Sequence, residues 1–494
     1  MNIKIFAGAC CIAGLLPFTA NADLGEGMTP EAGSRVLLNA DGLHDRWNGI
    51  GRLQLHEESP DAQCTATLID TREGETEGDA PAYVLSSAHC VSFDSLNITV
   101  DEPSGGHVDF NYFHDTAGKH LRYAVKQVSW SSLRGRDLAI IELDTSLQTL
   151  IDAGINPLRL ADKTPAIGDD VLIVGAPTQY EEKGLRLSAC SLISHEALIE
   201  HPMVYRRFYK DHCFGLKPGS SGGPLLDRRS NQVLAILATS TAMALEENRC
   251  FENAPCEVRE GQPHWAPASN YSHPVDTLAQ CFVDGWLMPE AEGCDLPSTA
   301  SITLKNHGIR YFKRIKDDAS GDVVLPTWKL AFDLSTPFYR HKTVRDPQQC
   351  ASPHHYSQAL IAKDALIDEP VGAEPGLYVL CILGVDSEEQ SPSLPLINNP
   401  MMIAMEIAQP GPTRMPVLNI GKDDAGGYRV QWQYSHPGLS GYEYKLGVDC
   451  DDTTGYQRIL DMLLIDPDKL PVALCSRAID MSGQRSAPRY DLLK

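Results

Sequence analysis

Residues 217–225 read Lys217-Pro218-Gly219-Ser220-Ser221-Gly222-Gly223-Pro224-Leu225, a run rich in Gly and Ser. Small residues stand on both sides of Ser221, so the backbone can turn tightly around one hydroxyl group. The same turn would let the amides of Gly219 and Ser221 converge on one point. Because a run of Gly and Ser is more often an ordinary loop, its meaning depends on the rest of the chain.

Two segments upstream of this stretch give it that meaning. The first combines Cys64-Thr65-Ala66-Thr67-Leu68-Ile69 with Val84-Leu85-Ser86-Ser87-Ala88-His89-Cys90. The second is Arg136-Asp137-Leu138-Ala139-Ile140-Ile141-Glu142-Leu143, in which an Asp enters an apolar strand. Burial of that carboxylate is costly unless another group accepts its charge. Asp144 is interpreted as a turn residue at the end of the strand.

The three segments, in this order, resemble the chymotrypsin/trypsin family of secreted serine proteases. The resemblance implies a double β-barrel, a catalytic triad of His89, Asp137 and Ser221, and an oxyanion hole made by the amides of Gly219 and Ser221. The intervals of 48 residues from His89 to Asp137 and 84 from Asp137 to Ser221 leave room for two barrels. The implied reaction is peptide hydrolysis through an acyl-enzyme, on a protein or peptide substrate. This chemistry requires no metal or organic cofactor, and none is expected.

Two departures from trypsin place the chain in a particular branch of the family. Ser220 stands where trypsin-like zymogens carry an Asp that pairs with the new N-terminus, so the chain looks more like the bacterial, non-zymogen, glutamyl-endopeptidase-like members. Gly215 stands where trypsin carries the Asp that selects Lys and Arg. We therefore expect a non-tryptic specificity pocket that involves Gly215 and is walled partly by Ala238, Thr239 and Ser240.

Composition and the N-terminus indicate a globular protein that is exported. The chain has 494 residues, of which 43% are hydrophobic and 22% charged. A net charge of −23 argues against a nucleic-acid partner. Lys4, the apolar run of residues 5–18 and Ala20-Asn21-Ala22 predict a signal peptide over residues 1–22, with a secreted (extracellular or periplasmic) product. Cys10 leaves a lipoprotein anchor as the less favoured alternative, and no later segment is long and apolar enough to span a membrane.

The pattern along the chain predicts a mainly β protein with several domains. Residues 23–45 are expected to be a leader or short propeptide, and short β-type runs then extend over a protease domain at residues 46–296. Beyond a Pro/Glu/Gly-rich boundary, Lys316-Asp317-Asp318-Ala319 recurs as Lys422-Asp423-Asp424-Ala425, and each is followed by a Trp, Trp328 and Trp432. We expect two tandem β-sandwich repeats, residues 297–400 and 401–494, which resemble fibronectin type III or related immunoglobulin-like domains. Their Asp pairs are interpreted as turn residues rather than calcium ligands.

Cysteine usage favours disulfides over a metal site. Removal of Cys10 and Cys11 with the signal peptide would leave 12 of the 14 cysteines, with no clustered Cys/His spacing. The family resemblance implies the pairs Cys64–Cys90 and Cys190–Cys213, and equivalent positions in the repeats suggest Cys350–Cys381 and Cys450–Cys475. The neighbours Cys250–Cys256 and Cys281–Cys294 remain, although the sequence alone cannot fix connectivity.

Two functions of different class are compatible with this organisation. The first is an active secreted endopeptidase whose C-terminal repeats bring it to a surface, a polymer or a protein. The alternative is a non-catalytic binding or adhesion protein that uses the protease fold as a scaffold. The presence of all three triad residues favours the enzyme, because a scaffold has no chemical need for them together.

Overall fold

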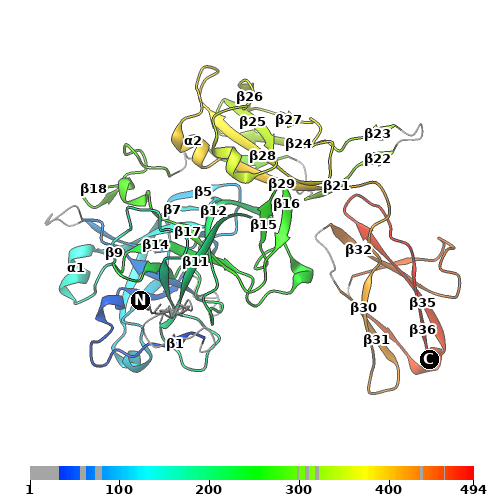
Figure 1. The fold of residues 1–494 in the computed structure, drawn as a ribbon, viewed down its shortest axis with the longest axis horizontal. Coiled ribbons are helices and arrows are strands. Elements are labelled where there is room, and N and C mark those ends of the chain that lie inside the picture. The colour runs from blue at the N-terminus through cyan, green and yellow to red at the C-terminus, as the bar shows by residue number, and fades with distance from the viewer. Residues whose placement is uncertain are drawn as a thin grey trace, which may run out of the picture.

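The computed structural model describes residues 33–55, 63–72, 80–296, 300–305, 311–317, 322–433, 438–460 and 462–494. Several predicted features lie outside these residues. They are the signal peptide (residues 1–22), the first part of the leader (residues 23–32), the first three residues of the first repeat (residues 297–299) and Asp318-Ala319 of the repeated motif. The described chain is mainly β, as predicted, with two short α-helices, α1 (Leu147–Asp152) and α2 (Leu394–Asn398). Figure 1 shows the barrels of the N-terminal part together, with two further β units beside them.

Six strands close into a first barrel. In pairing order they are β2 (Ile50–Gln54), β3 (Cys64–Leu68), β4 (Pro81–Ser86), β9 (Leu138–Ser146), β7 (Leu121–Ser132) and β6 (His107–Phe110), which pairs back with β2. β5 (Ile98–Pro103) also pairs with β7. Every residue of β4 is buried. The reason is that Ala82 and Val84 belong to the core of this barrel, whereas Tyr83 and Leu85 face a second core.

A second closed ring of six strands follows. It consists of β10 (Asp170–Gly175), β11 (Arg186–Glu200), β12 (Met203–Asp211), β17 (Asn270–Pro274), β14 (Val233–Ser240) and β13 (Pro224–Asp227), which pairs back with β10. Four short strands extend this sheet, namely β1 (Arg35–Val36), β8 (Arg134–Gly135), β15 (Cys256–Arg259) and β16 (Gln262–Trp265). A separate hairpin of β18 (Phe282–Val283) and β19 (Trp286–Leu287) comes after them.

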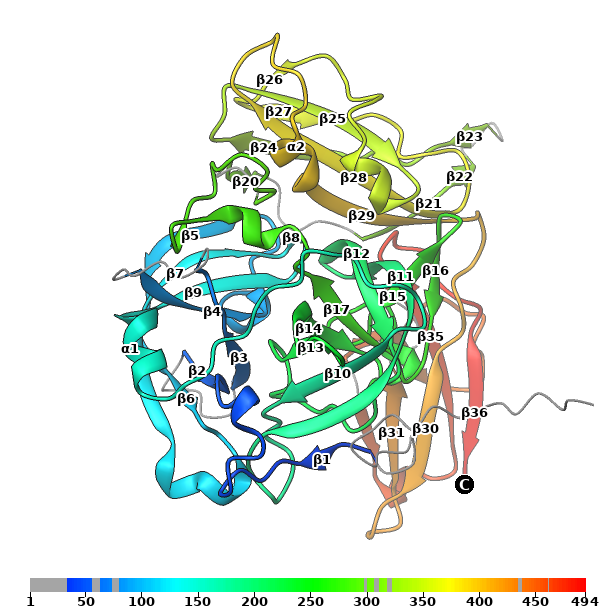
Figure 2. The same ribbon diagram turned by 60° about the vertical axis from the view of Figure 1, so that its left-hand side comes forward.

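The two barrels lie side by side (Figure 2). They share a hydrophobic core. Leu85, Trp130 and Leu138 of the first barrel belong to the same cluster of buried side chains as Val174 and Ile236 of the second. This is the double barrel that the family resemblance implies. The loops that carry residues 87–93 and 212–223 leave the strands next to this shared core, so a site built from both barrels can form there.

Residues 33–45 differ from the loose leader that the sequence predicts, because they pack on the barrels. β1 pairs antiparallel with the start of β11. Leu37 is fully buried in the core between the barrels, and its amide donates to the carbonyl of Leu185 at 2.8 Å. The Asn39 amide donates to Asp115 at 2.7 Å. Backbone pairing and one buried Leu fix this segment, and neither produces a periodic pattern in the sequence.

Two further units follow, and each is made of two facing groups of strands. The first unit contains a three-stranded sheet of β20 (Ile302–Leu304), β24 (Leu330–Leu334) and β27 (Ala365–Ile367), and a five-stranded sheet of β21 (Phe312–Arg314), β29 (Met401–Ala408), β28 (Gly376–Val385), β25 (Phe338–Val344) and β26 (Leu360–Ile361). A hairpin of β22 (Lys316–Asp317) and β23 (Val323–Val324) extends from it. The second unit contains β30 (Val417–Lys422), β31 (Tyr428–Gln433) and β34 (Met462–Ile465), and opposite them β33 (Gln457–Ile459), β32 (Leu439–Leu446), β35 (Val472–Asp480) and β36 (Arg489–Leu493).

The two units share an arrangement around their disulfides. In the first unit Lys342 lies opposite Cys381, and the Tyr356 hydroxyl donates to the carbonyl of Cys350 at 2.7 Å. In the second unit Lys445 lies opposite Cys475 in the same way. Tyr456 likewise donates to the carbonyl of Cys450, at 2.8 Å. The interpretation that the units are two copies of one module stays a prediction.

Direct contacts join the units to each other and to the barrels. The Gly261 carbonyl, in the turn between β15 and β16, accepts hydrogen bonds from the Leu377 amide at 2.8 Å and the Arg345 guanidinium at 3.0 Å. Arg314 of the first unit forms an ion pair with Asp480 of the second, with Nη2 and Oδ2 2.9 Å apart. Asp480 has a fully buried side chain, so this ion pair is shielded from solvent.

Six disulfides join cysteines within the described part of the chain. They join Cys64–Cys90, Cys190–Cys213, Cys250–Cys256, Cys281–Cys294, Cys350–Cys381 and Cys450–Cys475, which are the pairs named from the sequence. The first four lie in the barrel region and the last two in the C-terminal units. In each C-terminal disulfide one cysteine lies on a central strand of the larger sheet, Cys381 on β28 and Cys475 on β35.

Candidate active site

His89 and Asp137 are joined by two hydrogen bonds. His89 lies in the short 3₁₀-helix Ala88–Cys90 directly after β4, and Asp137 directly precedes β9, which pairs with β4. The His89 amide donates to Oδ1 of Asp137 at 3.0 Å, and His89 Nδ1 lies 2.7 Å from Oδ2. Asp137 is 1% exposed. A proton on Nδ1 would satisfy this buried carboxylate and leave Nε2 free to accept another proton.

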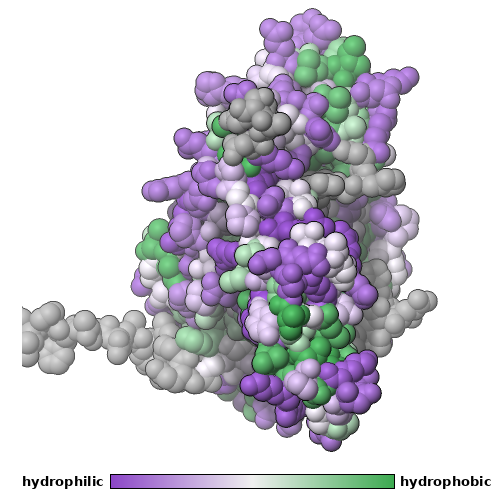
Figure 3. Space-filling model, turned by 90° about the vertical axis from the view of Figure 1, so that its right-hand side faces the viewer, coloured by the Kyte–Doolittle hydropathy of each residue, from purple (hydrophilic) through white to green (hydrophobic). Residues whose placement is uncertain are grey.

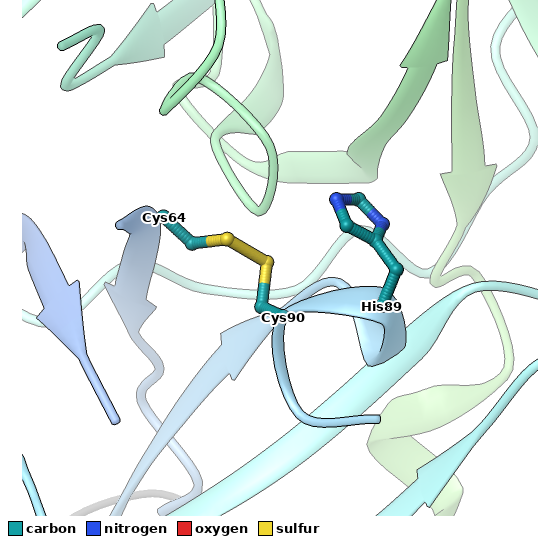
Figure 4. Close-up of side chains that lie close together, drawn as sticks. All are labelled: Cys64, His89 and Cys90. Atoms are coloured by element: carbon teal, nitrogen blue, oxygen red, sulfur yellow. A yellow bond between two sulfur atoms is a disulfide. The ribbon is translucent and has the colours of Figure 1, made fainter. Parts of the chain in front are cut away.

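The Cys64–Cys90 disulfide anchors the short helix that carries His89. Figure 4 shows it between the first residue of β3 and the end of the 3₁₀-helix, with the His89 ring projecting from the same helix. Cys64, His89 and Cys90 come close enough to suggest a metal site, as do Cys190, Asp211 and Cys213. In both groups the two sulfurs are bonded to each other, so neither offers a thiolate ligand.

The electrostatic environment of His89 favours its protonated form. Burial of the imidazole lowers the pKa of His89, but the charge of Asp137 and the hydrogen bond to it raise the pKa more, so the net shift is upward. An imidazole that gains a proton in this position would be stabilised by the adjacent carboxylate. The pair can therefore act as a general base with a stabilised conjugate acid.

Ser221 lies on a tight loop that contacts the first barrel. Its carbonyl accepts a hydrogen bond from the Thr65 amide at 2.7 Å. Gly219 and Gly222 have φ angles of +94° and +82°, which side chains with a Cβ atom rarely adopt. A Cβ atom on Gly222 would lie 2.1 Å from the Thr65 carbonyl oxygen. The glycines beside Ser221 are therefore required by the shape of the loop.

One open cavity of about 860 Å³ brings the predicted residues of both barrels together. His89, Ser221, Gly219 and Ser220 line it. In the described chain no hydrogen bond joins Ser221 to His89; such contacts are often long in sites without substrate. Three exposed hydrophobic side chains also line the cavity, namely Phe93, Met243 and Leu245. These three were not anticipated, because they lie in loops without a recognisable motif.

The residues expected in the specificity pocket separate into two groups. Ala238, Thr239 and Ser240 line the cavity. Gly215 is not among the lining residues, and its carbonyl accepts hydrogen bonds from the Tyr180 hydroxyl at 2.9 Å and the Ser34 hydroxyl at 3.1 Å. Gly215 thus connects the Ser221 loop to the N-terminal segment. The Leu216 side chain, one position later, reaches the cavity instead.

A buried carboxyl group, Glu200, stands behind the cavity wall. It is 3% exposed, and its Oε1 accepts hydrogen bonds from the Thr239 hydroxyl at 2.9 Å and the Asn253 amide at 2.6 Å. Burial raises the pKa of Glu200 to about 8, and the two hydrogen bonds and the nearby His89 oppose this rise. No motif marks Glu200, because its partners come from β14 and from the loop closed by Cys250–Cys256.

Glu200 should make the stability of the protease region depend on pH. Since its pKa is higher in the folded than in the unfolded chain, the folded state binds the extra proton between pH 4.5 and 8. Its contribution to the free energy of unfolding should fall by about 1.4 kcal/mol per pH unit in this window. Glu200→Gln keeps an Oε1 acceptor and removes the titration. We expect the melting temperature of the variant, minus that of the wild type, to rise steadily from pH 5 to 8 in thermal unfolding; a constant difference would contradict the assignment.

Comparison with protein families supports the barrel region as a peptidase. Residues 64–236 match the family described as "Trypsin-like peptidase domain". This match spans β3 to β14 and includes His89, Asp137 and Ser221. This stretch of the chain is thus similar to that family, and the C-terminal units lie outside the match. None of the curated proteins matches the chain.

Solved structures similar to the chain match about half of its length. The active form of the Rv3671c protease from M. tuberculosis is 16% identical, with a TM-score of 0.31, over 49% of this chain and 82% of that chain. The human heparin binding protein is 13% identical, with a TM-score of 0.31, over 49% of this chain and 91% of that chain. The inactive form of the Rv3671c protease is 15% identical, with a TM-score of 0.29, over 50% and 95%.

Proposed function

We propose that this trypsin-like peptidase domain makes the chain an exported serine endopeptidase, with Ser221, His89 and Asp137 as its catalytic triad. The observation that carries the proposal is the 2.7 Å contact of His89 Nδ1 with the buried Asp137, on a cavity that His89 and Ser221 both line. Each of the three residues comes from a different segment of the chain.

The reaction follows from the roles of the three side chains. The Ser221 hydroxyl oxygen attacks the peptide carbonyl while His89 Nε2 takes its proton, and Asp137 stabilises the resulting imidazolium. The carbon–nitrogen bond then breaks, and His89 gives its proton to the leaving amine. Water adds to the acyl-enzyme and passes a proton to His89. Release of the carboxylic acid product returns that proton to Ser221.

The amides of Gly219 and Ser221 are suited to stabilise the negatively charged oxygen of the tetrahedral intermediates. Among the backbone hydrogen bonds of the described residues, neither amide donates to a carbonyl group. The intervening Ser220 amide, in contrast, donates to the Lys217 carbonyl at 3.0 Å. Two free amides beside the nucleophile are the donors that an oxyanion hole requires.

The exposed apolar side chains of the cavity suit substrates with apolar side chains. Phe93, Met243 and Leu245 are 55%, 61% and 64% exposed, so their apolar surface is open to a bound peptide. The wall of Ala238, Thr239 and Ser240 carries no charge. The preference for non-tryptic sequences stays a prediction, because Gly215, from which we predict it, does not line the cavity.

Export and the C-terminal units complete the proposal. Six disulfides suit an oxidising compartment, and no helix among the described residues is long and apolar enough to cross a membrane. The C-terminal unit carries exposed hydrophobic side chains, and Figure 3 shows hydrophobic residues gathered on the lower part of the face that this unit presents. A surface or polymer partner for the C-terminal units stays a prediction.

Covalent labelling with a fluorophosphonate tests the proposed function. We expect the purified chain beginning at Asp23 to react, with mass spectrometry locating the adduct on Ser221. The Ser221→Ala variant should not react, whereas a Ser220→Ala variant, altered at the neighbouring hydroxyl, should still be labelled. A folded wild-type chain that takes up no label would contradict the enzyme and favour the alternative, a binding or adhesion protein with a protease scaffold.

A further inference from the structure

Thr65 connects the first barrel with the Ser221 loop through its backbone amide and its side-chain hydroxyl. It is fully buried on β3. Its amide donates to the Ser221 carbonyl at 2.7 Å, and its hydroxyl donates to the Gly219 carbonyl at 2.8 Å. The same hydroxyl accepts a hydrogen bond from the Ala176 amide at 2.9 Å. One residue therefore contacts the loop on both sides of Ser220, with its hydroxyl at Gly219 and its backbone amide at Ser221.

The contact with Gly219 fixes the central peptide of the loop. The peptide between Gly219 and Ser220 is bound at both ends, because its carbonyl accepts from Thr65 and its amide donates to the Lys217 carbonyl at 3.0 Å. This peptide lies between the two peptides whose amides belong to Gly219 and Ser221. If it rotated, both of these amides would change direction, and the oxyanion hole would lose its geometry.

We propose that Thr65 is a positioning residue that keeps the oxyanion hole formed, an inference that rests on the proposed function. The loop lacks a charged residue at position 220 that could tie it to the protein interior by an ion pair. Ser220 is buried, at 2% exposure, and packs near Gly175. The neutral hydroxyl of Thr65 holds the neighbouring carbonyl instead, and it does so without any processing of the chain.

Thr67 offers a matched control on the same strand. It is also fully buried, but its hydroxyl has no hydrogen-bond partner among the described residues. Thr65→Val and Thr67→Val thus make the same chemical change at two equally buried positions. The first leaves the Gly219 carbonyl and the Ala176 amide without a partner, whereas the second removes an unpaired hydroxyl.

The test measures kcat and KM on a peptide ester, together with fluorophosphonate labelling and the melting temperature. We expect Thr65→Val to lower kcat by about 10- to 100-fold, since loss of one oxyanion donor typically costs about 10²–10³-fold. KM should stay within about 2-fold, because the hydroxyl does not touch substrate. Thr65→Ser, which keeps the hydroxyl, should stay within about 3-fold of the wild-type kcat, and Thr67→Val within about 2-fold.

The outcomes separate the two proposals. Wild-type kcat in a folded Thr65→Val variant, with a wild-type enzyme that is labelled, would overturn the role of Thr65 and leave the proposed function intact. A wild-type chain that is not labelled would overturn the proposed function itself. If Thr65→Val fails to fold, the pair Thr65→Ala and Thr65→Ser decides: equal kcat values in both would also overturn the proposal, and activity that depends on the hydroxyl would support it.

Discussion

Asp137→Asn should lower kcat by about 10⁴-fold while the fold stays intact. An Asn side chain can still accept the hydrogen bond of the His89 amide through its oxygen. Its other terminus is an NH₂ group, which would donate to His89 Nδ1 at the position now occupied by Oδ2. The imidazole would then carry its proton on Nε2, so it could not accept the proton of Ser221.

Steady-state kinetics between pH 5 and 9, with Asp144→Asn as control, check this expectation. Asp144 is an exposed residue of the same strand, β9, so its replacement should leave kcat within about 2-fold of the wild type. Because the charge of Asp137 raises the pKa of His89, the acid limb of kcat/KM should also move to lower pH in Asp137→Asn. A decrease of less than about 10-fold would show that Asp137 is not the residue that orients His89.

The sequence predicted the parts of the site whose backbone shape is set by residues in a local motif. His89 stands next to Cys90, and the Cys64–Cys90 pair fixes the turn that presents it. Gly219 and Gly222 record the positive φ angles of the Ser221 loop. In both cases the proposed catalytic residue and the residues that shape its backbone lie within a few positions of each other in the sequence.

The parts that the sequence did not predict depend on partners far away in the chain. The hydroxyl of Thr65 finds its acceptor 154 positions later, and the hydroxyl of Ser34 finds Gly215 181 positions later. Glu200 takes its partners from β14 and from Asn253. Buried polar contacts of this kind satisfy groups that folding removes from water, and any of several residue types could fill either end. A single sequence therefore carries no sign of which pairs form.

The same reasoning applies to the domain arrangement. Alternation of apolar residues predicted β units along the chain, because each strand has its own pattern. The packing of the first C-terminal unit on the turn at Gly261 uses backbone groups and Arg345. These groups are common on any surface, so their pairing could not be foreseen. The buried ion pair of Arg314 with Asp480 is a similar case.

Removal of residues 33–37 should reduce activity although the segment lies outside the cavity. The Ser34 hydroxyl donates to the Gly215 carbonyl, six positions before Ser221, and Arg186 donates to the Ser34 hydroxyl at 3.0 Å. β1 pairs with β11, and burial of a side chain such as Leu37 stabilises a fold by about 1.5–3 kcal/mol. A chain that begins at Leu38 loses all of these contacts, so the loop that carries Gly215 and Ser221 loses one of its supports.

We expect kcat/KM of the chain beginning at Leu38 to fall by about 100-fold or more, since a displacement of about 1 Å in a catalytic group can cost about 10²-fold. The matched control is a chain that begins at Gly33, which should retain the activity of the chain beginning at Asp23. Labelling by a fluorophosphonate, measured below the melting temperature of each chain, reports the state of the loop. In the full chain Ser34→Ala removes one hydrogen bond and should cost a few-fold at most. Equal activity of the chains beginning at Gly33 and Leu38 would show that the segment is dispensable for activity and that the Ser221 loop keeps its shape without it.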